Sequence, residues 1–480
     1  MSRSASRHHL EAPGLSNWEP PGLQSGARAA VRTARRRGAV IVLSVTGDLG
    51  PGFDPSAIVA ASRRADEPWF CFEQPDSAGS ALAALGAVTA IEASGPDRFT
   101  AVARRWQECV ADALTVGGDG PPGSGLAAVG GFAFAPEGAA APAWQGFAPA
   151  SLIVPEVSLA RRGDTSWLTV NAAVAPDDTA EDVLARVAGR LTSLRVAALP
   201  LLDPAPTGRF EVSSPLAPAH FEAAVSRAVE QIRGGELAKI VLAREVEVRA
   251  PAPHDPTAVF SVLRDAYPSS FVFAVGRGPA TFMGATPELL VRREGQRATT
   301  VALAGSTRRS ADPAVDDHLG EALLRSDKDR EENAIVARRI ARALRPHAVW
   351  VTAAPEPVVV RVANIQHLAC PIRAQLASPL TAIELVSALH PTPAVGAEPA
   401  GALSLIPALE GIDRGWYAGP IGWTDAGGDG EFCVGLRSAL LRDRVASCYA
   451  GCGIVADSDP AAELAESELK LGVMLPALAG

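Results

Sequence analysis

The sequence predicts a single α+β unit with mostly antiparallel sheets in its core and helices outside. Helical stretches alternate with runs of short apolar segments separated by turn residues, which is typical of hairpin-rich α+β proteins. No internal repeat interrupts this order. Of the 480 residues, 48% are hydrophobic, which is enough for one large core.

The N-terminal part divides by composition. Residues 1–37 are rich in Pro, Gly, Ser and Arg without periodicity, so we expect a flexible basic extension. Residues 38–205 form the expected N-terminal half of the fold, with a helix at 98–114. The Gly-rich piece at 117–125 lacks the GK[ST] of a phosphate loop and is expected to be a connector. The expected strands of this half are AVIVLSVTG (39–47), WFCFEQ (69–74), AVTAIEA (87–93), LAAVGGFAFA (126–135) and SLIVPEVSLA (151–160).

A proline-rich joint at 199–208 leads into the second half, residues 206–480. Because both halves are rich in strands, we expect them to share one sheet system. Apolar residues at helical spacing predict helices over 220–233, over one long stretch at 318–344, and at the end of the chain. The expected strands are KIVLAREVEV (239–248), FVFAVG (271–276), ELLVRRE (288–294), VVVRVANIQHL (358–368), GEFCVGLRSALLRD (430–443) and RVASCYAGCGIV (444–455).

Charge and cysteine usage limit the class of protein. The net charge of −9 and the absence of a basic stripe argue against a nucleic-acid partner. No apolar run reaches the ~20 residues that span a bilayer. None of the six cysteines lies in a CxxC pair, which favours reduced thiols rather than a zinc site or a disulfide framework. We therefore expect a cytoplasmic protein that does not bind membranes.

Lysine is almost absent from this chain. Among 44 basic residues only Lys239, Lys328 and Lys470 are lysines. Biased codon usage explains the many arginines but does not explain why these three positions remain lysine. Lysine can lose its proton and act as a base, whereas arginine cannot. Lys239, which opens an apolar strand after a Gly-Gly turn, is the strongest candidate, although a lysine at a strand end is often only a solubilising charge.

Two helices each carry a pair of carboxylates three residues apart. Asp329 and Glu332 lie on one helix face, and Glu463 and Glu466 lie on one face of the last helix. If the faces meet, four carboxylates converge, which suits Mg²⁺. Spacing alone favours the simpler interpretation, two solvated faces with internal salt bridges.

Other candidates are weak one by one. Glu288 enters an apolar strand, where a carboxyl group tends to keep its proton as a general acid must, but a surface glutamate is the simpler view. Arg437, within the apolar run CVGLRSALL, should face a carboxylate of the protein or of a ligand. His367 and His390 are more often structural than catalytic in such settings.

In chain order, however, the motifs are specific. They are KIVLAREV (239–246), GATPELLVRREG (284–295), ALAGSTRR (302–309), SDKDREEN (326–333), NIQHLACPI (364–372), HPTPAVG (390–396), DRGWYAGPIGW (413–423), EFCVGLRSAL (431–440), GCGIV (451–455) and AELAESELKL (462–471). This series resembles the chorismate-utilising enzymes, and within them the isochorismate synthases, strongly over residues 210–480 and more loosely from about residue 38. The resemblance implies a single large fold of the aminodeoxychorismate-synthase type.

The resemblance implies roles for individual positions. Lys239 matches the general base that activates water, and Glu288 matches the general acid. Mg²⁺ is the implied cofactor, held directly by Glu332 and Glu466, with Asp329 and Glu463 acting directly or through metal-bound water. The implied substrate-binding residues are Tyr417, Arg437, Gly451, Gly453, Lys470 and His367. Lys328 is expected to be only a charge on the helix surface.

The implied reaction is the Mg²⁺-dependent conversion of chorismate to isochorismate. A salicylate synthase, which continues to pyruvate elimination, shares the same residues and stays an alternative, as does a silent binding protein. No glutamine amidotransferase partner is implied, because ALAGS and HPTPAVG differ from the motifs of ammonia users. We expect a monomer. Asn333 and Ala397 depart from the usual pattern, where many relatives have histidine and glycine. The sequence leaves open whether the product feeds menaquinone, a siderophore or salicylate.

Overall fold

The computed structural model describes residues 15, 18–203, 206–362 and 365–479. Residues 23–37, which the sequence predicts to be flexible, instead form a helix. The reason is a buried stripe of small residues, with Ala27, Ala30 and Ala34 packed toward strand β1 (Ile41–Pro51). Residues 1–14, 16 and 17 of the predicted extension lie outside the described residues.

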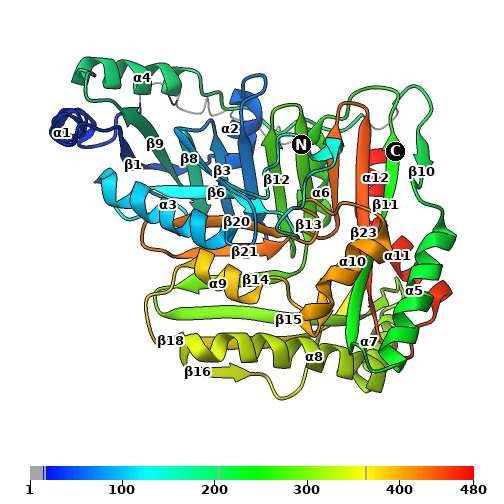
Figure 1. The fold of residues 1–480 in the computed structure, drawn as a ribbon. Helices are drawn as coiled ribbons and strands as arrows, with labels where there is room; N and C mark the ends of the chain where they lie inside the picture. Colours follow the sequence, from blue (N-terminus) through cyan, green and yellow to red (C-terminus); the bar gives the residue numbers. More distant parts are fainter. Residues whose placement is uncertain (1–14, 16–17, 204–205, 363–364, 480) are drawn as a thin grey trace, which may run out of the picture.

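The described strands form two large sheets, which Figure 1 shows one above the other with strands running across each other. The upper sheet has 13 strands, and all its pairs are antiparallel except β1 with β5. In spatial order its strands are β10 (Glu211–Ser213), β11 (Lys239–Arg249), β23 (Val445–Ile454), β22 (Ser438–Arg442), β13 (Ala280–Thr286), β12 (Phe271–Arg277), β2 (Trp69–Gln74), β3 (Ser80–Leu85), β8 (Val157–Arg162), β9 (Thr165–Val174), β1 (Ile41–Pro51) and β5 (Leu114–Gly117), with β19 (Ala397–Glu398) beside β11.

The lower sheet has ten strands among the described residues, and all its pairs are antiparallel. In spatial order they are β16 (Ala348–Ala353), β18 (Ile365–Leu376), β15 (Arg297–Arg308), β14 (Leu289–Glu294), β21 (Gly430–Val434), β20 (Pro420–Asp425), β6 (Ala127–Phe132), β7 (Ala150–Val154) and β4 (Thr89–Ala93), with β17 (Val358–Arg361) beside β18.

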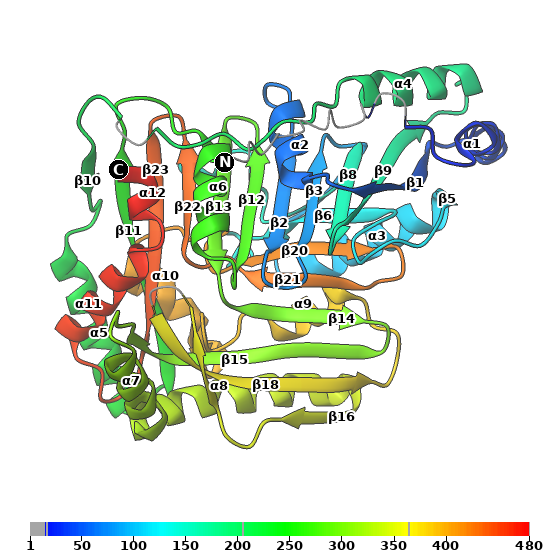
Figure 2. The ribbon, with the colours of Figure 1, turned by 180° about the vertical axis from the view of Figure 1, so that it is seen from behind.

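Helices cover the outer faces of both sheets, as Figures 1 and 2 show. One apolar cluster joins both sheets and the helices at residues 98–112, 327–344 and 382–389, and a second lies under the helices on the outer face of the upper sheet. The α+β class and its antiparallel core are thus confirmed. The helices are α1 (Leu23–Arg37), α2 (Pro55–Ser62), α3 (Arg98–Asp112), α4 (Ala180–Thr192), α5 (Pro218–Arg233), α6 (Pro256–Ala266), α7 (Pro313–Arg325), α8 (Asp327–Leu344), α9 (Ala382–Leu389), α10 (Leu405–Glu410), α11 (Pro460–Leu471) and α12 (Leu475–Ala479).

Both halves of the chain contribute to both sheets. In the upper sheet β2 pairs with β12, and in the lower sheet β6 pairs with β20. The two sheets are therefore built jointly, as the similar strand content of the halves predicts. No helix in the described part of the chain is long and apolar enough to cross a bilayer.

Several predicted elements differ from the structure. The predicted strand 358–368 is divided between β17 and β18, which pair antiparallel with each other. The run 151–160 is two strands in different sheets, β7 and β8, separated at Pro155, which lacks a backbone N–H for the ladder. The long helix at 318–344 is two helices, because Ser326 has extended backbone and caps α8 by accepting from the Asp329 N–H. Arg437 lies not within a strand but in the turn between β21 and β22, with φ of 49°.

Candidate active site

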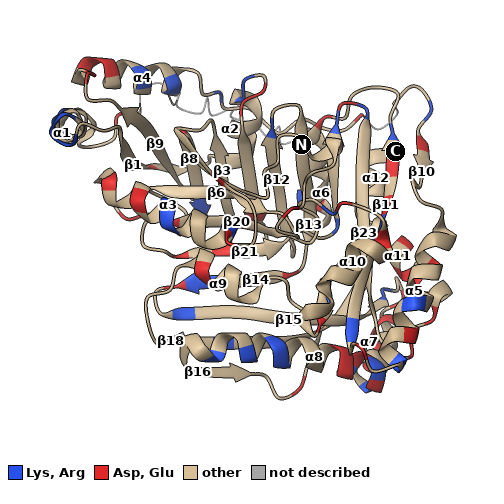
Figure 3. Cartoon of the chain, in the orientation of Figure 1, with Lys and Arg blue, Asp and Glu red and all other residues tan. Residues whose placement is uncertain are grey.

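A pocket lies where one end of the upper sheet meets the lower sheet, α8 and α11. Strands β15 and β18 line it from the lower sheet and β11 and β23 from the upper sheet. Figure 3 shows acidic and basic residues gathered over α7, α8 and α11 at this end of the molecule. The predicted site residues that line the pocket are Glu288, Asp329, Glu332, His367, Tyr417, Arg437, Gly451, Gly453, Glu463, Glu466 and Lys470.

Lys239, the first residue of β11, is fully buried beside this pocket; it does not line the pocket itself but contacts Glu332, which does. Its Nζ donates to Glu332 Oε1 at 2.7 Å, which connects the upper sheet to α8. A buried ammonium needs such a partner, because an unpaired charge in an apolar interior is very costly. The strand start therefore places the one fully buried lysine against one of the predicted metal ligands.

Every lysine of the chain pairs with a different carboxylate of this pocket. Besides the Lys239–Glu332 pair, Lys470 Nζ lies 2.7 Å from Glu466 Oε1 on α11. Lys328 Nζ, on α8, lies 3.4 Å from Glu463 Oε1 on α11. The two acidic helix faces thus meet across the pocket, and the interpretation as two solvated faces is wrong.

Three carboxyl groups of the pocket, Asp329, Glu463 and Glu466, differ in how readily they ionise. Burial acts to raise the pKa of Glu466, but Lys470 and the Ser306 hydroxyl together lower it to about 2. Burial raises the pKa of Glu463, and the charge of Glu466 adds to that effect. The pKa of Asp329 is also raised by burial. Carboxyl groups that crowd one another in this way repel, and a cation among them would relieve the repulsion.

The donor set fits a hard divalent cation. Carboxylate oxygens predominate, and Mg²⁺ prefers oxygen ligands. Among the described His, Cys, Asp and Glu residues, Cys452, Glu463 and Glu466 form the group whose ligand atoms lie within 4.8 Å of one another. Burial raises the pKa of the Cys452 thiol well above its usual range, so this sulfur stays protonated and is a poor ligand.

Glu288 lies at the entry to β14 with only 5% of its surface exposed. Burial raises its pKa to about 7, against the lowering effects of the nearby cations Lys239, Arg437 and Lys470. A carboxyl group that titrates near neutrality can hold a proton and release it during a reaction. Glu288 is buried, as the apolar strand predicts, but its surroundings include three cations and are not simply apolar.

Arg437, His367 and Tyr417 form a cationic, hydrogen-bonding wall of the pocket. Arg437 Nη2 donates to His367 Nε2 at 3.4 Å. Burial, together with the charges of Arg437 and Lys470, lowers the pKa of His367 well below its usual value, so this imidazole is neutral. Burial raises the pKa of Tyr417 to about 12, so its phenol is also neutral. Buried without a protein carboxylate in hydrogen-bonding contact among the described residues, the Arg437 guanidinium is available to a ligand carboxylate.

Two glycines of β23 make room for these groups. A Cβ at Gly453 would lie 2.3 Å from Glu332 Oε1 and 2.9 Å from Lys239 Cε. A Cβ at Gly451 would lie 3.0 Å from the Tyr417 hydroxyl, and the Gly451 carbonyl accepts from Lys470 Nζ at 2.9 Å. Both glycines therefore leave space for neighbouring side chains, and Gly451 also supplies a backbone acceptor for Lys470.

Comparisons with known proteins identify the family. Residues 29–479 match the chorismate binding enzyme family. The chain is 38% identical, over 91% of its length and 90% of the relative's, to the salicylate biosynthesis isochorismate synthase of Pseudomonas aeruginosa. It is 35% identical to the isochorismate synthase MenF of Bacillus subtilis, covering 73% of this chain and 74% of that relative.

A solved structure gives the same result for the fold. The menaquinone-specific isochorismate synthase of Escherichia coli superimposes with a TM-score of 0.75 at 26% identity, covering 95% of this chain and all of that one. The chain belongs to the chorismate-binding enzymes. The resemblance that its motifs predict is thereby confirmed, and with it the single large fold.

Some residues of this chorismate-binding enzyme have contacts that its sequence did not predict. Lys328 is not simply a surface charge: its side chain is 42% exposed, but it faces the pocket and pairs with Glu463. Ser306 donates to Glu466 Oε1 at 3.1 Å. The ALAGSTRR motif contains Ser306, but spacing alone gives no hint of a partner 160 residues away.

The two departures from the family pattern, and His390, are structural. The Asn333 Nδ2 amide lies within hydrogen-bonding distance of the carbonyls of Ala302, Ala304 and Leu368, which ties α8 to β15 and β18. Ala397 pairs with Ile240 beside the start of β11. His390 is buried away from the pocket, with its Nε2 3.0 Å from the Phe134 carbonyl.

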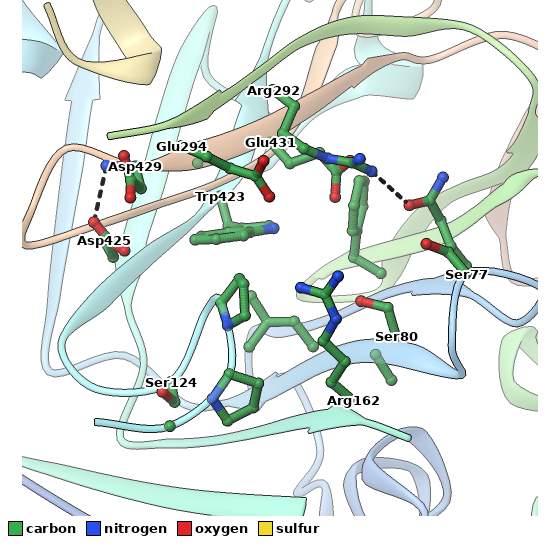
Figure 4. Close-up of a pocket in the computed structure, with 18 of the residues that line it drawn as sticks. Ser77, Ser80, Ser124, Arg162, Arg292, Glu294, Trp423, Asp425, Asp429 and Glu431 are labelled. Carbon is green, nitrogen blue, oxygen red and sulfur yellow. Dashed lines mark hydrogen bonds and ion pairs between the residues drawn. The ribbon is translucent and has the colours of Figure 1, made fainter. Parts of the chain in front are cut away.

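A second pocket of this chorismate-binding enzyme lies between the sheets, away from the lysines (Figure 4). The predicted connector at 117–125 lines part of it. Its charged groups largely satisfy one another: Arg292 pairs with Glu431 and donates to Gln74, and Arg293 pairs with Asp429. None of the predicted catalytic, substrate-binding or metal-binding residues lines it.

Proposed function

We propose that this enzyme converts chorismate to isochorismate. The observation that carries the proposal is a buried lysine paired with a carboxylate of the pocket, together with a buried carboxyl group that titrates near neutrality and four carboxylates that line the same pocket. The names of the relatives support the same reaction. A lysine, a carboxyl group that can hold a proton, and a cluster of carboxylates together suit the addition of water with loss of a hydroxyl group.

In the proposed mechanism, Lys239 and Glu288 are the base and the acid. Lys239, once neutral, accepts a proton from the water whose oxygen bonds to ring carbon 2. The ring double bonds shift, and the hydroxyl at ring carbon 4 departs as water with the proton from Glu288. The atoms of one water molecule enter and those of one leave, so substrate and product are isomers.

Cationic and neutral donors would orient the substrate. Arg437 and Lys470 supply the positive charge, and the neutral Tyr417 phenol donates a hydrogen bond, so together they suit the enolpyruvyl carboxylate. The neutral His367 imidazole lies against Arg437, where it would contact the ring. Gly451 and Gly453 leave room for the ligand and for the Lys239–Glu332 pair.

We propose Mg²⁺ as the cofactor, held by Glu332 and Glu466, with Asp329 and Glu463 acting directly or through bound water. When bound, the ion would fix the ring carboxylate and withdraw electron density from the diene. Glu332 has two carboxylate oxygens, so a cation and the Lys239 ammonium would share it, and the positive charge of the cation would favour loss of the lysine proton.

Product analysis tests the proposed reaction. Purified enzyme is incubated with chorismate and MgCl₂, and the products are separated chromatographically. We expect isochorismate without salicylate or pyruvate, and no turnover after chelation with EDTA. Salicylate with pyruvate would indicate the salicylate synthase that shares these residues. An absence of any turnover would contradict the proposal.

A further inference from the structure

Strand β11, which begins with Lys239, has a gap along one edge. Along its other edge it pairs continuously with β23, from Ile240 to Arg249. On the gapped edge, β19 pairs only with Lys239 and Ile240, and β10 pairs only with residues 247–249. Among the described strands, none pairs with the stretch between them, so its backbone groups on that edge need other partners.

The side chains of Glu410 and Arg414 provide two of those partners. The Ala243 N–H donates to Glu410 Oε1 at 2.6 Å, and Arg414 Nη2 donates to the Val241 carbonyl at 2.9 Å. Arg414 Nε also donates to Glu410 Oε2 at 3.0 Å, so the two form a buried ion pair. Together with the Gly396 carbonyl, which accepts from the Val241 N–H at 2.8 Å, they satisfy three of the backbone groups along this edge.

The same arginine reaches the loops that form the pocket wall. Its Nη1 donates to the Val395 carbonyl at 2.7 Å. Its own carbonyl accepts from the Tyr417 N–H at 2.9 Å, and its guanidinium lies 5.9 Å from the centre of the Tyr417 ring. Val241, Val395, Arg414 and Tyr417 all line the pocket. Arg414 thus connects β11, the 394–396 loop and the Tyr417 turn.

Such a pair is poorly explained by stability alone. Both side chains are nearly fully buried, and the cost of removing two charges from water can exceed their attraction. A buried pair instead fixes the relative positions of the segments that it connects, because each of its hydrogen bonds holds one backbone group in place. Apolar side chains could fill the same space without fixing β11 relative to the loops.

We propose that Glu410 and Arg414 are positioning residues that set the base Lys239 against the substrate-binding Tyr417. This inference rests on the proposed function. Neither residue reacts with the substrate. They act through the backbone of β11, only two residues beyond Lys239, and through the backbone of Tyr417.

Arg414→Lys tests the role with the full-length enzyme and Mg²⁺. It keeps the charge beside Glu410 but cannot bridge the Val241 and Val395 carbonyls together. We expect kcat to fall at least tenfold. KM for chorismate should change less than kcat, because Arg437 and Lys470 still hold the substrate. Glu410→Gln keeps an acceptor for the Ala243 N–H but removes the ion pair, and we expect a similar fall in kcat.

The matched control is Arg190→Lys, in the buried Arg190–Glu67 pair on α4, away from the pocket. All variants are compared at a temperature where far-UV circular dichroism shows them folded. A merely structural role would lower Tm in test and control variants alike and leave kcat of the folded protein unchanged. If both test variants keep kcat within twofold of wild type, or if Arg190→Lys loses as much, the positioning role is wrong. A wild-type enzyme that forms no isochorismate contradicts instead the proposed function.

Discussion

Glu288 illustrates how burial of one carboxyl group affects both activity and stability. Its pKa, raised to about 7 by burial, lies above that of a free glutamic acid in the unfolded chain. As an acid it must carry a proton, so we expect kcat/KM to fall as the pH rises through about 7. A pH profile of the wild-type enzyme measures this. A rate that stays constant between pH 6 and 9 would contradict the assignment.

Glu288→Gln should separate the effect of this carboxyl group on activity from its effect on stability. Gln donates no proton, so kcat should fall about 10²- to 10⁴-fold, the range for general acids. Because the folded-state pKa is raised, the stability linked to this proton is present below about pH 4.5 and is lost as the pH rises to about 7. The free energy of unfolding of the variant should therefore rise relative to that of the wild type, by up to about 3 kcal/mol, when the pH changes from 5 to 8. Urea unfolding of both proteins at both pH values measures this difference. A difference that is the same at pH 5 and pH 8 would contradict the raised pKa of Glu288.

Lys239 tests the base directly. Lys239→Ala should abolish hydration while chorismate still binds, because Arg437 and Lys470 remain. Lys239→Arg is the sharper control, since it keeps a cation for Glu332 but cannot lose its proton. We expect both to lose at least about 10³-fold in kcat, within the range for general bases. Isothermal titration with chorismate checks binding, and wild-type turnover in either variant would exclude this role for Lys239.

At the level of elements, the pairing of β11 with β23 places Gly453 beside the Lys239–Glu332 pair. The groups that a Cβ would meet are the mobile ends of these two side chains, not backbone atoms. Gly453→Ala should therefore change Tm little but displace the base and a metal ligand, lowering kcat at least tenfold. Differential scanning calorimetry and steady-state kinetics measure the two effects. A large loss of Tm with unchanged kcat would show that the glycine serves the fold instead.

The boundaries of elements show what the sequence can predict. The strand at Lys239 and the helix at 220–233 follow from apolar periodicity, and the structure agrees closely. Ser326 was less predictable, because a serine inside a helical pattern either caps a new helix or is tolerated within one. Arg437 was similarly ambiguous, since the apolar run around it continues through the turn. Which carboxylates meet which lysines depends on tertiary contacts between α8 and α11 that no local pattern records.

At the scale of the whole molecule, neither half should fold alone. A fragment of residues 206–480 would expose the edges of β12 and β20, which pair with β2 and β6 in the full chain. It would also lose part of the apolar cluster that joins both sheets. We expect this fragment to be insoluble by itself and to regain activity when co-expressed with residues 1–205. A soluble fragment with cooperative unfolding would contradict this expectation.

The fold class and the shared sheets were predictable because strand content is similar along the chain. The assignment of strands to the upper or the lower sheet was less predictable. Residues 151–160 pass from the lower to the upper sheet at Pro155, and a continuous apolar run does not show which sheet each part joins. The order of the motifs identifies the family. It does not show that side chains of Glu410 and Arg414, from a distant segment, bind backbone groups along the open edge of β11.

The confinement of all three lysines to one pocket has a practical consequence for spectroscopy. Reductive methylation with ¹³C-formaldehyde labels amines, and apart from the terminal α-amine this chain carries them only at the pocket. Lys328, 42% exposed, should react before the buried Lys239. Each resulting methyl signal would report on one carboxylate partner, so a protein of this size could be followed through a few assigned resonances.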